Sequence, residues 1–298
     1  MYEASLQASV NRRKCAIILP GGGQQGAVES GVLIRLHEAG LLRGVETIAG
    51  VSTGAIVGAY AATGHIEAAR IFHRNVNNRL FRYTPSRLLR GIVDLTSVEH
   101  ELRTHTPLNV DALKLSPIRV RVGLTEFETA EGRFVEINKV DDPVAYLLAS
   151  ACIPRISDRK KIAIDGKYYV DGSIAAEFPI DFHSGITDFL IVIPWNPDYT
   201  NPFKENFVHL AERIFAAGLH EPLKSEITSH RRKNRFIYEQ LFRNGYMESA
   251  YQVNVLIIHP TRKLIGVTSM DHFQIQEGMN HAYHYTGQLI DEVLKSFS

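Results

Sequence analysis

Ser52 lies in the segment Gly50-Val51-Ser52-Thr53-Gly54, between an apolar run and a helical pattern. A serine hydroxyl is a weak nucleophile unless it is exposed beside a base, and a sharp strand-to-helix turn provides that exposure. Gly50 and Gly54 leave room for such a turn, and the first N–H groups of the helix point toward developing negative charge. The segment predicts a serine nucleophile for carboxylic esters, although a Gly-x-Ser-x-Gly string also arises by chance.

A glycine-rich loop precedes this turn, with the sequence Gly21-Gly22-Gly23-Gln24-Gln25-Gly26. Its backbone can turn several N–H groups toward one point, which suits the oxyanion of an acyl-transfer intermediate or a pyrophosphate. The string also fits the dinucleotide fingerprint, because Glu46 follows at about the expected twenty residues. A ribose-binding carboxylate belongs at the end of the second strand, whereas Glu46 opens that strand. Oxyanion binding is therefore favoured over nucleotide binding.

A third segment places an aspartate at the end of a short predicted strand, in Tyr168-Tyr169-Val170-Asp171-Gly172-Ser173. A carboxylate at a strand end is well placed for catalysis. Asp-Gly is also a common turn, and Asp165-Gly166 nearby is the dipeptide most typical of a two-residue hairpin. Taken alone, Asp171 therefore fits a plain turn.

The elements that must position these residues alternate along the chain. Strands are predicted at 15–19, 45–49, 118–125, 133–137, 162–164, 168–170, 189–193 and 253–258. Helices are predicted at 28–39, 55–63, 67–107 (irregular), 144–151, 207–219, 227–242 and 274–295. Gly40 and Gly64 are placed to end the first two helices. This alternation predicts one α/β domain over 14–296 with a mostly parallel sheet, after a short polar extension over 1–13.

The composition narrows the class of protein. The 298 residues are 45% hydrophobic and carry a formal net charge of +1, which gives no global reason to expect a nucleic-acid partner. Cys15 and Cys152 lie in apolar stretches far apart, as buried reduced thiols do. Because neither a secretory signal nor a membrane span is visible, we expect a cytoplasmic protein. Peripheral membrane contact would use arginines interleaved with apolar residues over 79–90, or the basic run over 230–235.

Order and spacing of the three segments resemble the patatin-like phospholipase family, which also has a segment similar to Ala149-Ser150-Ala151-Cys152-Ile153-Pro154. The resemblance runs from Lys14 to the final helix. It implies a three-layer fold, a mostly parallel central sheet flanked by helices, and a lipid acyl hydrolase of phospholipase A, lysophospholipase or esterase type. It also implies that no metal or cofactor is needed and that the substrate is a lipid or phospholipid acyl ester.

The resemblance assigns roles to individual residues. Ser52 attacks the ester and Asp171 acts as the base, in a dyad without histidine. The oxyanion-binding N–H groups belong to Gly22, Gly23 and Gln24. The remaining motif positions are Gly21, Gly26, Gly50, Gly54, Gly172 and Ser173.

Two features bear on the strength of this site. A carboxylate with an ordinary pKa of about 4 is a weak base for a hydroxyl, so burial near Ser52 would have to make Asp171 more basic. The chain also has Gln25 where the family usually has Arg, and Glu177 where it usually has Asn. Loss of the Arg removes a fixed positive charge, and a buried Glu177 beside Asp171 would raise the aspartate's pKa by repulsion between like charges.

Other interpretations stay open at this stage. One is a lipid-binding or regulatory protein that keeps the fold without turnover, which Gln25 and Glu177 motivate. Another is a Ser-His-Asp hydrolase using Asp188 with His259 or His272, although only about two strands precede the serine. His281 and His284 are three residues apart on a predicted helix, but no third ligand with matching spacing predicts a metal site. The sequence predicts neither acyl-chain and head-group preference nor oligomeric state.

Overall fold

The computed structural model describes residues 14–80, 93–175, 188–192, 219–226, 254–260, 265, 269 and 271–296. Several predictions lie outside these residues. They are the N-terminal extension, the predicted helix over 227–242, nearly all of the one over 207–219, most of the arginine-rich segment over 79–90, the basic run over 230–235, and Glu177.

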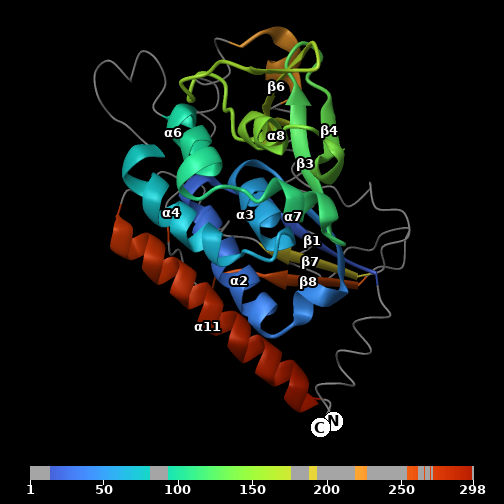
Figure 1. Ribbon diagram of the computed structural model, residues 1–298, viewed down its shortest axis with the longest axis vertical. Helices are drawn as coiled ribbons and strands as arrows, with labels where there is room; N and C mark the ends of the chain where they lie inside the picture. Colours follow the sequence, from blue (N-terminus) through green and yellow to red (C-terminus); the bar gives the residue numbers. More distant parts are fainter. Residues whose placement is uncertain are drawn as a thin grey trace.

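An eight-stranded sheet forms the centre of the molecule, in the order β5-β6-β3-β2-β1-β7-β8, with β4 paired to β3 off this path. The strands are β1 (Cys15–Leu19), β2 (Val45–Gly50), β3 (Arg119–Glu126), β4 (Gly132–Glu136), β5 (Ile162–Ile164), β6 (Lys167–Asp171), β7 (Asp188–Val192) and β8 (Asn254–Ile258). The run β3-β2-β1-β7-β8 is parallel, whereas β4, β5 and β6 pair antiparallel. The sheet is mixed and mostly parallel, as predicted (Figure 1).

Strands β2 and β6 share one edge of β3. The first half of β3 pairs with β2, up to Val122 beside Gly50, and the second half pairs with β6, from Leu124 beside Asp171. Because β4 covers the other edge of β3 over this stretch, β2 and β6 must follow each other along the same edge. They run in opposite directions, so their carboxyl ends meet opposite the single residue Gly123.

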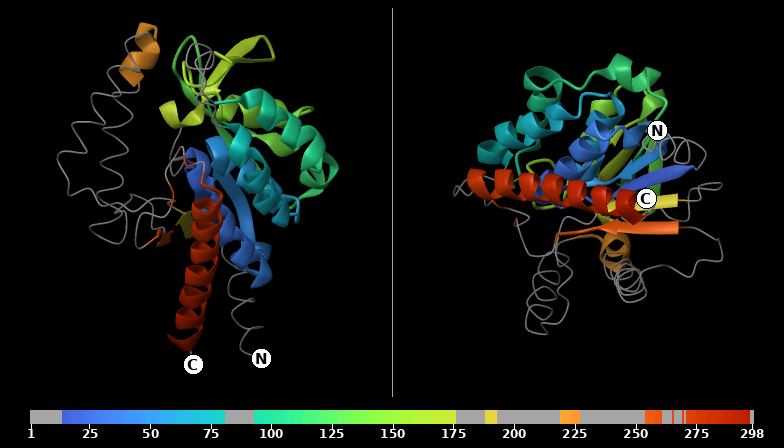
Figure 2. Two further views of the ribbon diagram at one scale, coloured as in Figure 1. Left: turned by 90° about the vertical axis from the view of Figure 1, so that its left-hand side faces the viewer. Right: turned by 90° about the horizontal axis from the view of Figure 1, so that it is seen from below.

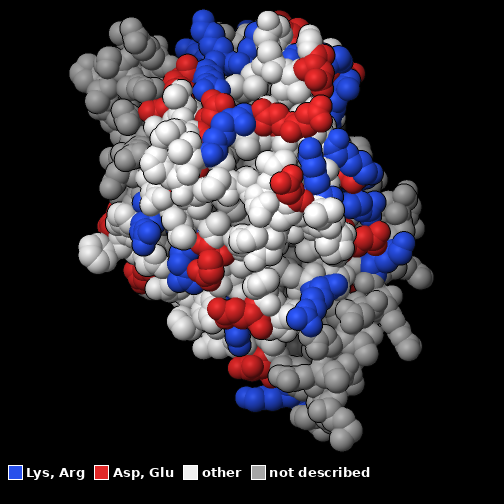
Figure 3. Space-filling view, in the orientation of Figure 1, with Lys and Arg blue, Asp and Glu red and all other residues white. Residues whose placement is uncertain are grey.

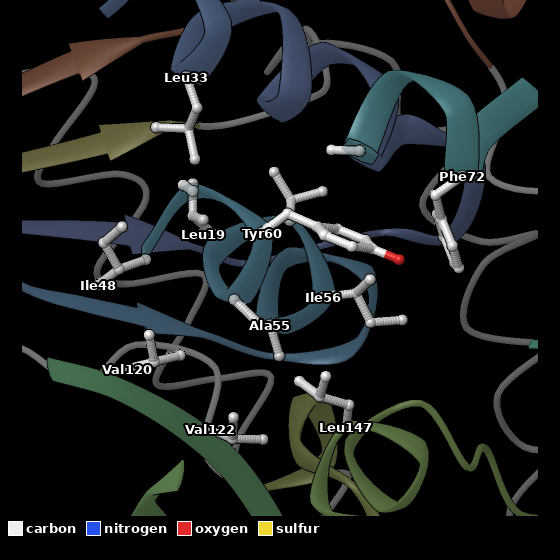
Figure 4. Packing of buried hydrophobic residues seen from close by; sticks show 14 of the residues in the cluster. Leu19, Leu33, Ile48, Ala55, Ile56, Tyr60, Phe72, Val120, Val122 and Leu147 are labelled. Carbon is white, nitrogen blue, oxygen red and sulfur yellow. The ribbon is translucent and has the colours of Figure 1, made fainter. Parts of the chain in front are cut away.

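Among the described residues, the longer helices that pack on one face of the sheet are α2 (Gly26–Glu38), α3 (Ser52–Ala62), α4 (Glu67–Leu80), α8 (Pro143–Ser150) and α11 (His272–Ser296). The side chains of Ile48, Val120 and Val122 on the strands face Ala55 and Ile56 of α3 (Figure 4). α11 lies along α2 on the outer side of this layer (Figure 2). Apolar side chains on one face of each strand thus form the main core with the helices.

Elsewhere a smaller cluster packs Leu219 and Leu223 against Val170 and Ile174. Leu223 belongs to a helical turn over 221–226. Two further short helices, α6 (Leu95–His100) and α7 (Val110–Leu115), lie between α4 and β3 in the chain. The sheet is thus flanked by helices, as expected for this fold class.

The predicted elements agree closely with the structure. All eight strands are present, with ends within one residue of the prediction. Gly40 and Gly64 end their helices with φ of 72° and 75°, and Asp165 and Gly166 both have positive φ, as a two-residue hairpin turn requires.

Three differences have local causes. α3 begins at Ser52 itself, three residues before its predicted start, because the helix starts inside the turn. The irregular helix predicted over 67–107 is not continuous: the Asp94 carboxylate caps α6 by accepting from the N–H of Ser97 at 3.0 Å. A π-helical turn, Glu101–His105, then follows α6 directly. The short α7 was also missed.

Helix length, helix apolarity and surface charge indicate how the described residues could meet a membrane. Within the described residues, no helix is both long enough and apolar enough to span a bilayer. On the face drawn in Figure 3, Lys and Arg are interspersed with Asp and Glu. The described residues also form ion pairs, such as Arg103 with Asp142 at 2.7 Å and Arg159 with Glu99 at 2.5 Å. This face therefore carries no large surface of one sign.

The contact between α2 and α11 gives a test of the fold. A Cβ at Gly31 would lie 2.2 Å from the carbonyl oxygen of Met279, which belongs to a backbone that cannot easily move. Gly to Ala usually stabilises a helix interior by about 1 kcal/mol. We expect Gly31→Ala to lower the free energy of unfolding instead, as measured by urea titration. Gly287→Ala is the control, because its Cβ would meet only the flexible end of Arg35, at 3.0 Å. If Gly31→Ala stabilises the protein, the close packing is wrong.

Candidate active site

The turn after β2 holds Ser52 in an unusual conformation. Its φ is 52°, in the left-handed region that costs a non-glycine residue about 1–2 kcal/mol. Close backbone contacts make the flanking glycines necessary, since a Cβ at Gly50 would lie 2.7 Å from the backbone of Gly54 and a Cβ at Gly54 would lie 2.3 Å from the carbonyl oxygen of Leu19. The N–H of Val51 also donates to that carbonyl at 3.1 Å. Strand β1 thus holds the turn from one side.

Asp171 is the last residue of β6 and caps a short 3-10 helix, Gly172–Ile174. Its Oδ1 accepts from the N–H of Ser173 at 2.8 Å. Its main chain is fixed on both sides, because its N–H donates to the carbonyl of Cys152 at 2.9 Å and its carbonyl accepts from the Thr125 hydroxyl at 2.9 Å. These two hydrogen bonds therefore fix the main chain of Asp171.

The second carboxylate oxygen of Asp171 is the chemically available one. The side chain is 1% exposed, and Oδ2 has no hydrogen-bond partner within the described part of the chain. Burial raises the pKa of Asp171 to about 6, against the opposing effect of hydrogen bonds from Ser173 and of the nearby Ser52 hydroxyl. The Ser52 hydroxyl thus lies close enough to lower this pKa, but it does not meet the geometry of a hydrogen bond to Oδ2.

The glycine-rich loop lies directly against the Ser52 turn. A Cβ at Gly21 would lie 2.5 Å from the carbonyl oxygen of Val51 and 3.3 Å from the Cβ of Ser52. The φ angles of Gly21, Gly22 and Gly23 are 74°, 121° and 61°, which L side chains rarely adopt. The backbone hydrogen bonds found among the described residues use the carbonyl of Gly22, as acceptor for Gln25, and not the N–H groups of Gly22 or Gly23. Two donors therefore remain for a ligand.

Both glutamines of the loop are buried. Gln24 is fully buried and Gln25 is 6% exposed. The Gln25 amide donates to the carbonyl of Ile265 at 3.0 Å, which ties the loop to a segment 240 residues away. The position that carries Arg in the resembled family is thus occupied by a neutral, buried side chain, and its role in this chain is to hold the loop.

Glu29 was missed by the sequence analysis. It is fully buried on α2, and its Oε1 accepts from the N–H of Gly21 at 2.8 Å. Burial raises the pKa of this carboxyl to about 8, and the hydrogen bond from Gly21 offsets only part of that effect. Glu29 is therefore neutral at pH 7 and fixes the first glycine of the loop. The available signal was an acidic residue in a predicted helix close to Ala27, Val28, Val32 and Leu33.

Two candidates for a histidine triad, Asp188 and His259, lie apart from Ser52. Asp188 pairs with Cys15 at the start of β1, whereas Ser52 follows the far end of the neighbouring strand. His259 follows β8, three strands from β2 in the sheet order, or about 14 Å between strand axes. His272 begins α11. The structure does not bring Asp188 and His259 together with the serine.

The nucleotide interpretation also lacks support. Glu46 pairs with Arg119 at 2.8 Å at the start of β2, away from the loop that follows β1. Among the described residues, no group of three or more His, Cys, Asp or Glu side chains is arranged to hold a metal ion. His281 stacks on Tyr285 of the same helix instead of facing His284.

Comparisons with known proteins indicate the family of the chain. A family model described as patatin-like phospholipase matches residues 17–182, more than half of the chain. Among solved structures, the chain is similar to VipD from Legionella pneumophila, with 12% identity, a TM-score of 0.49, and coverage of 94% of this chain and 67% of that one. It is also similar to the type III effector ExoU, with 14% identity, a TM-score of 0.42, and coverage of 95% and 53%.

A third similarity is to the ExoU–SpcU complex of Pseudomonas aeruginosa, with 15% identity, a TM-score of 0.37, and coverage of 95% of this chain and 52% of that one. The chain spans about half the length of the two ExoU chains.

The buried Glu29 carboxyl predicts a specific dependence of stability on pH. The pKa of Glu29 is about 8 in the folded protein and near 4.5 in the unfolded chain. The contribution of Glu29 to the stability of the folded protein is therefore fully present below pH 4.5 and is lost as the pH rises through 8. Glu29→Gln keeps the acceptor for Gly21 and cannot ionise. We expect the melting temperature of wild type, relative to Glu29→Gln, to fall between pH 5 and pH 8.5. If the melting temperatures of the two proteins change with pH in the same way over this range, that result would contradict a neutral Glu29.

Proposed function

The chain belongs to the patatin-like phospholipase family, which indicates a serine lipid acyl hydrolase, and we propose that it cleaves carboxylic esters of lipids with a dyad of Ser52 and Asp171. The observation that carries the proposal is the buried Oδ2 of Asp171, which has no hydrogen-bond partner among the described residues and belongs to a carboxyl whose pKa is lowered by the nearby Ser52 hydroxyl. A raised pKa makes this carboxylate a better base while leaving it mostly ionised at pH 7. These are the properties that a base for a serine nucleophile needs.

The proposed reaction has two halves. In the first, the Ser52 Oγ attacks the ester carbonyl carbon while its proton passes to Asp171. Asp171 then returns that proton to the departing alcohol, which leaves an acyl group on Ser52. In the second half, a water molecule attacks the acyl group and loses its proton to Asp171, and the proton returns to Ser52 as the fatty acid leaves. No metal or cofactor enters these steps.

The oxyanion of each tetrahedral intermediate would be bound by the N–H groups of Gly22, Gly23 and Gln24. The proposal is supported by the N–H groups of Gly22 and Gly23, which donate to no backbone carbonyl in the described part of the chain, and by the contact between Gly21 and the Ser52 turn. Gln25 brings no charge to this loop, so the N–H groups and the end of α3 would have to supply the stabilisation. Strain at Ser52, with its φ of 52°, is typical of residues at functional sites.

We further propose that residues 14–296 act as one catalytic domain. In support, strands from both ends of the sequence, β1 and β8, belong to one sheet, and α11 packs on α2 behind the glycine loop. The substrates are phospholipid or lysophospholipid acyl esters, and the enzyme meets them by peripheral contact with a membrane surface.

Loss of either dyad residue tests the proposal. We expect Ser52→Ala and Asp171→Asn each to lower hydrolysis of a short-chain p-nitrophenyl ester by about 10³-fold or more, because neither residue can act without the other. Asp94→Asn and Ser30→Ala are matched controls: both residues are buried, the Asp94 carboxylate caps α6, and the Ser30 hydroxyl donates to the carbonyl of Gly26 within α2. Activity that survives Ser52→Ala or Asp171→Asn unchanged would contradict the dyad.

Release of fatty acid from phospholipid vesicles separates this proposal from the alternative suggested by Gln25 and Glu177. An enzyme releases acid in a Ser52-dependent way. A lipid-binding protein without turnover would co-sediment with the vesicles and release none, and that result would sink the catalytic proposal while leaving the fold unchanged.

The pH profile reports on the base itself. The pKa of Asp171 is about 6, so the ionised form that accepts the proton predominates above pH 6 and is lost below it. We expect kcat/KM for the p-nitrophenyl ester to rise with pH through an apparent pKa of about 6 and then level off. Because an unperturbed carboxyl would place that limb near pH 4, a plateau that extends down to pH 4.5 would show that burial does not tune Asp171.

A further inference from the structure

Ser150 forms a hydrogen-bonded bridge between the nucleophile turn and β3. Its side chain is fully buried at the end of α8. The Ser150 Oγ accepts from the backbone N–H of Ser52 at 2.9 Å and donates to the carbonyl of Gly123 at 2.7 Å. One hydroxyl therefore satisfies a buried donor in the turn after β2 and a buried acceptor within β3.

The bridge acts at the strained residue of the turn. Ser52 has a left-handed φ, and it is the first residue of α3, where backbone N–H groups have no partner within the helix. The bond to Ser150 supplies that partner for Ser52. Without it, the N–H would be buried and unpaired, and one restraint on the left-handed conformation would be lost.

The same short segment also fixes the base. Two residues after Ser150, the carbonyl of Cys152 accepts from the backbone N–H of Asp171 at 2.9 Å. The end of α8 and the residues that follow it thus bond to the main chain of both Ser52 and Asp171. The distance between nucleophile and base is set through this segment.

Close packing leaves little freedom at the point where the two strand ends meet. A Cβ at Gly172 would lie 2.2 Å from the Gly123 carbonyl oxygen and 2.9 Å from a methyl group of Val51. The carbonyl that Ser150 binds is therefore the one against which the residue after Asp171 packs. A shift of this carbonyl would move both ends of the dyad.

From these contacts we propose that Ser150 is a positioning residue, which holds the backbone of Ser52 at the distance and angle that Asp171 requires. Ser150 does not contact the reacting atoms. The inference rests on the proposed function, because it presupposes that Ser52 is the nucleophile. It goes further because it gives a structural role to the segment from Ala149 to Pro154, none of whose residues takes part in the dyad mechanism.

The test compares Ser150→Ala and Ser150→Cys with wild type and with Ser52→Ala. Small misplacements of a nucleophile lower rates by about 10²-fold. For the short-chain p-nitrophenyl ester, we therefore expect Ser150→Ala to lower kcat by about 10- to 100-fold and to change KM by less than about threefold. Ser150→Cys keeps the shape with a weaker hydrogen-bonding group, and its kcat should lie between those of wild type and Ser150→Ala. The control is Thr286→Val, which removes a fully buried hydroxyl that bonds only within α11 and should leave kcat unchanged.

Each outcome has a single meaning. If Ser52→Ala is inactive and Ser150→Ala keeps wild-type kcat, the positioning role is wrong while the nucleophile stands. If Ser52→Ala keeps wild-type activity, the proposed function fails. A role in stability alone would lower the melting temperature without the selective fall in kcat. If Ser150→Ala does not fold, Ser150→Cys decides, because a folded Cys variant with wild-type kcat also overturns the inference.

Discussion

The meeting of two strand ends along one edge of β3 is the constraint on which the candidate site depends. β2 pairs with the first half of β3 and β6 with the second, so that Gly50 and Asp171 lie on either side of the level of Gly123. The chain cannot continue straight from either strand. β2 turns into α3 at Ser52, β6 turns into a 3-10 helix at Gly172, and the two turns face each other. Opposed strand directions in a mixed sheet thus create the juxtaposition of hydroxyl and carboxylate.

Burial gives this juxtaposition its chemistry. A solvent-exposed aspartate would be too weak a base for a serine hydroxyl, but removal from water raises the pKa of Asp171 to about 6. The same effect raises the pKa of Glu29 to about 8, so the carboxyl that holds Gly21 stays neutral at pH 7 and adds no negative charge next to the glycine-rich loop. In the proposed mechanism Asp171 therefore acts as a base, whereas Glu29 serves as a neutral hydrogen-bond acceptor. Asp171 accepts from the N–H of Ser173, and Glu29 accepts from the N–H of Gly21.

The sequence was sufficient to predict the strands, the hairpins and the sharp turn at Ser52, because these depend on local patterns such as the glycines around Ser52. Asp171 was different: its own segment fitted a plain turn, and only the resemblance to a family marked it as the base. Contacts between distant segments could not be predicted at all. The bond from Gln25 to Ile265 joins residues 240 positions apart, and the bridge through Ser150 depends on how α8 packs against α3 and β3, which no local pattern reports.

The most direct test of the central claim, that Ser52 is a nucleophile activated by Asp171, is covalent labelling with a fluorophosphonate probe at pH 7.5, followed by mass spectrometry of peptides. Such a probe reacts with an activated serine and not with ordinary hydroxyls. We expect one adduct on wild-type protein, on the peptide that contains Ser52, and labelling at least about tenfold slower on Asp171→Asn. An adduct on another residue, or labelling of Ser52 at the same rate in Asp171→Asn, would contradict it.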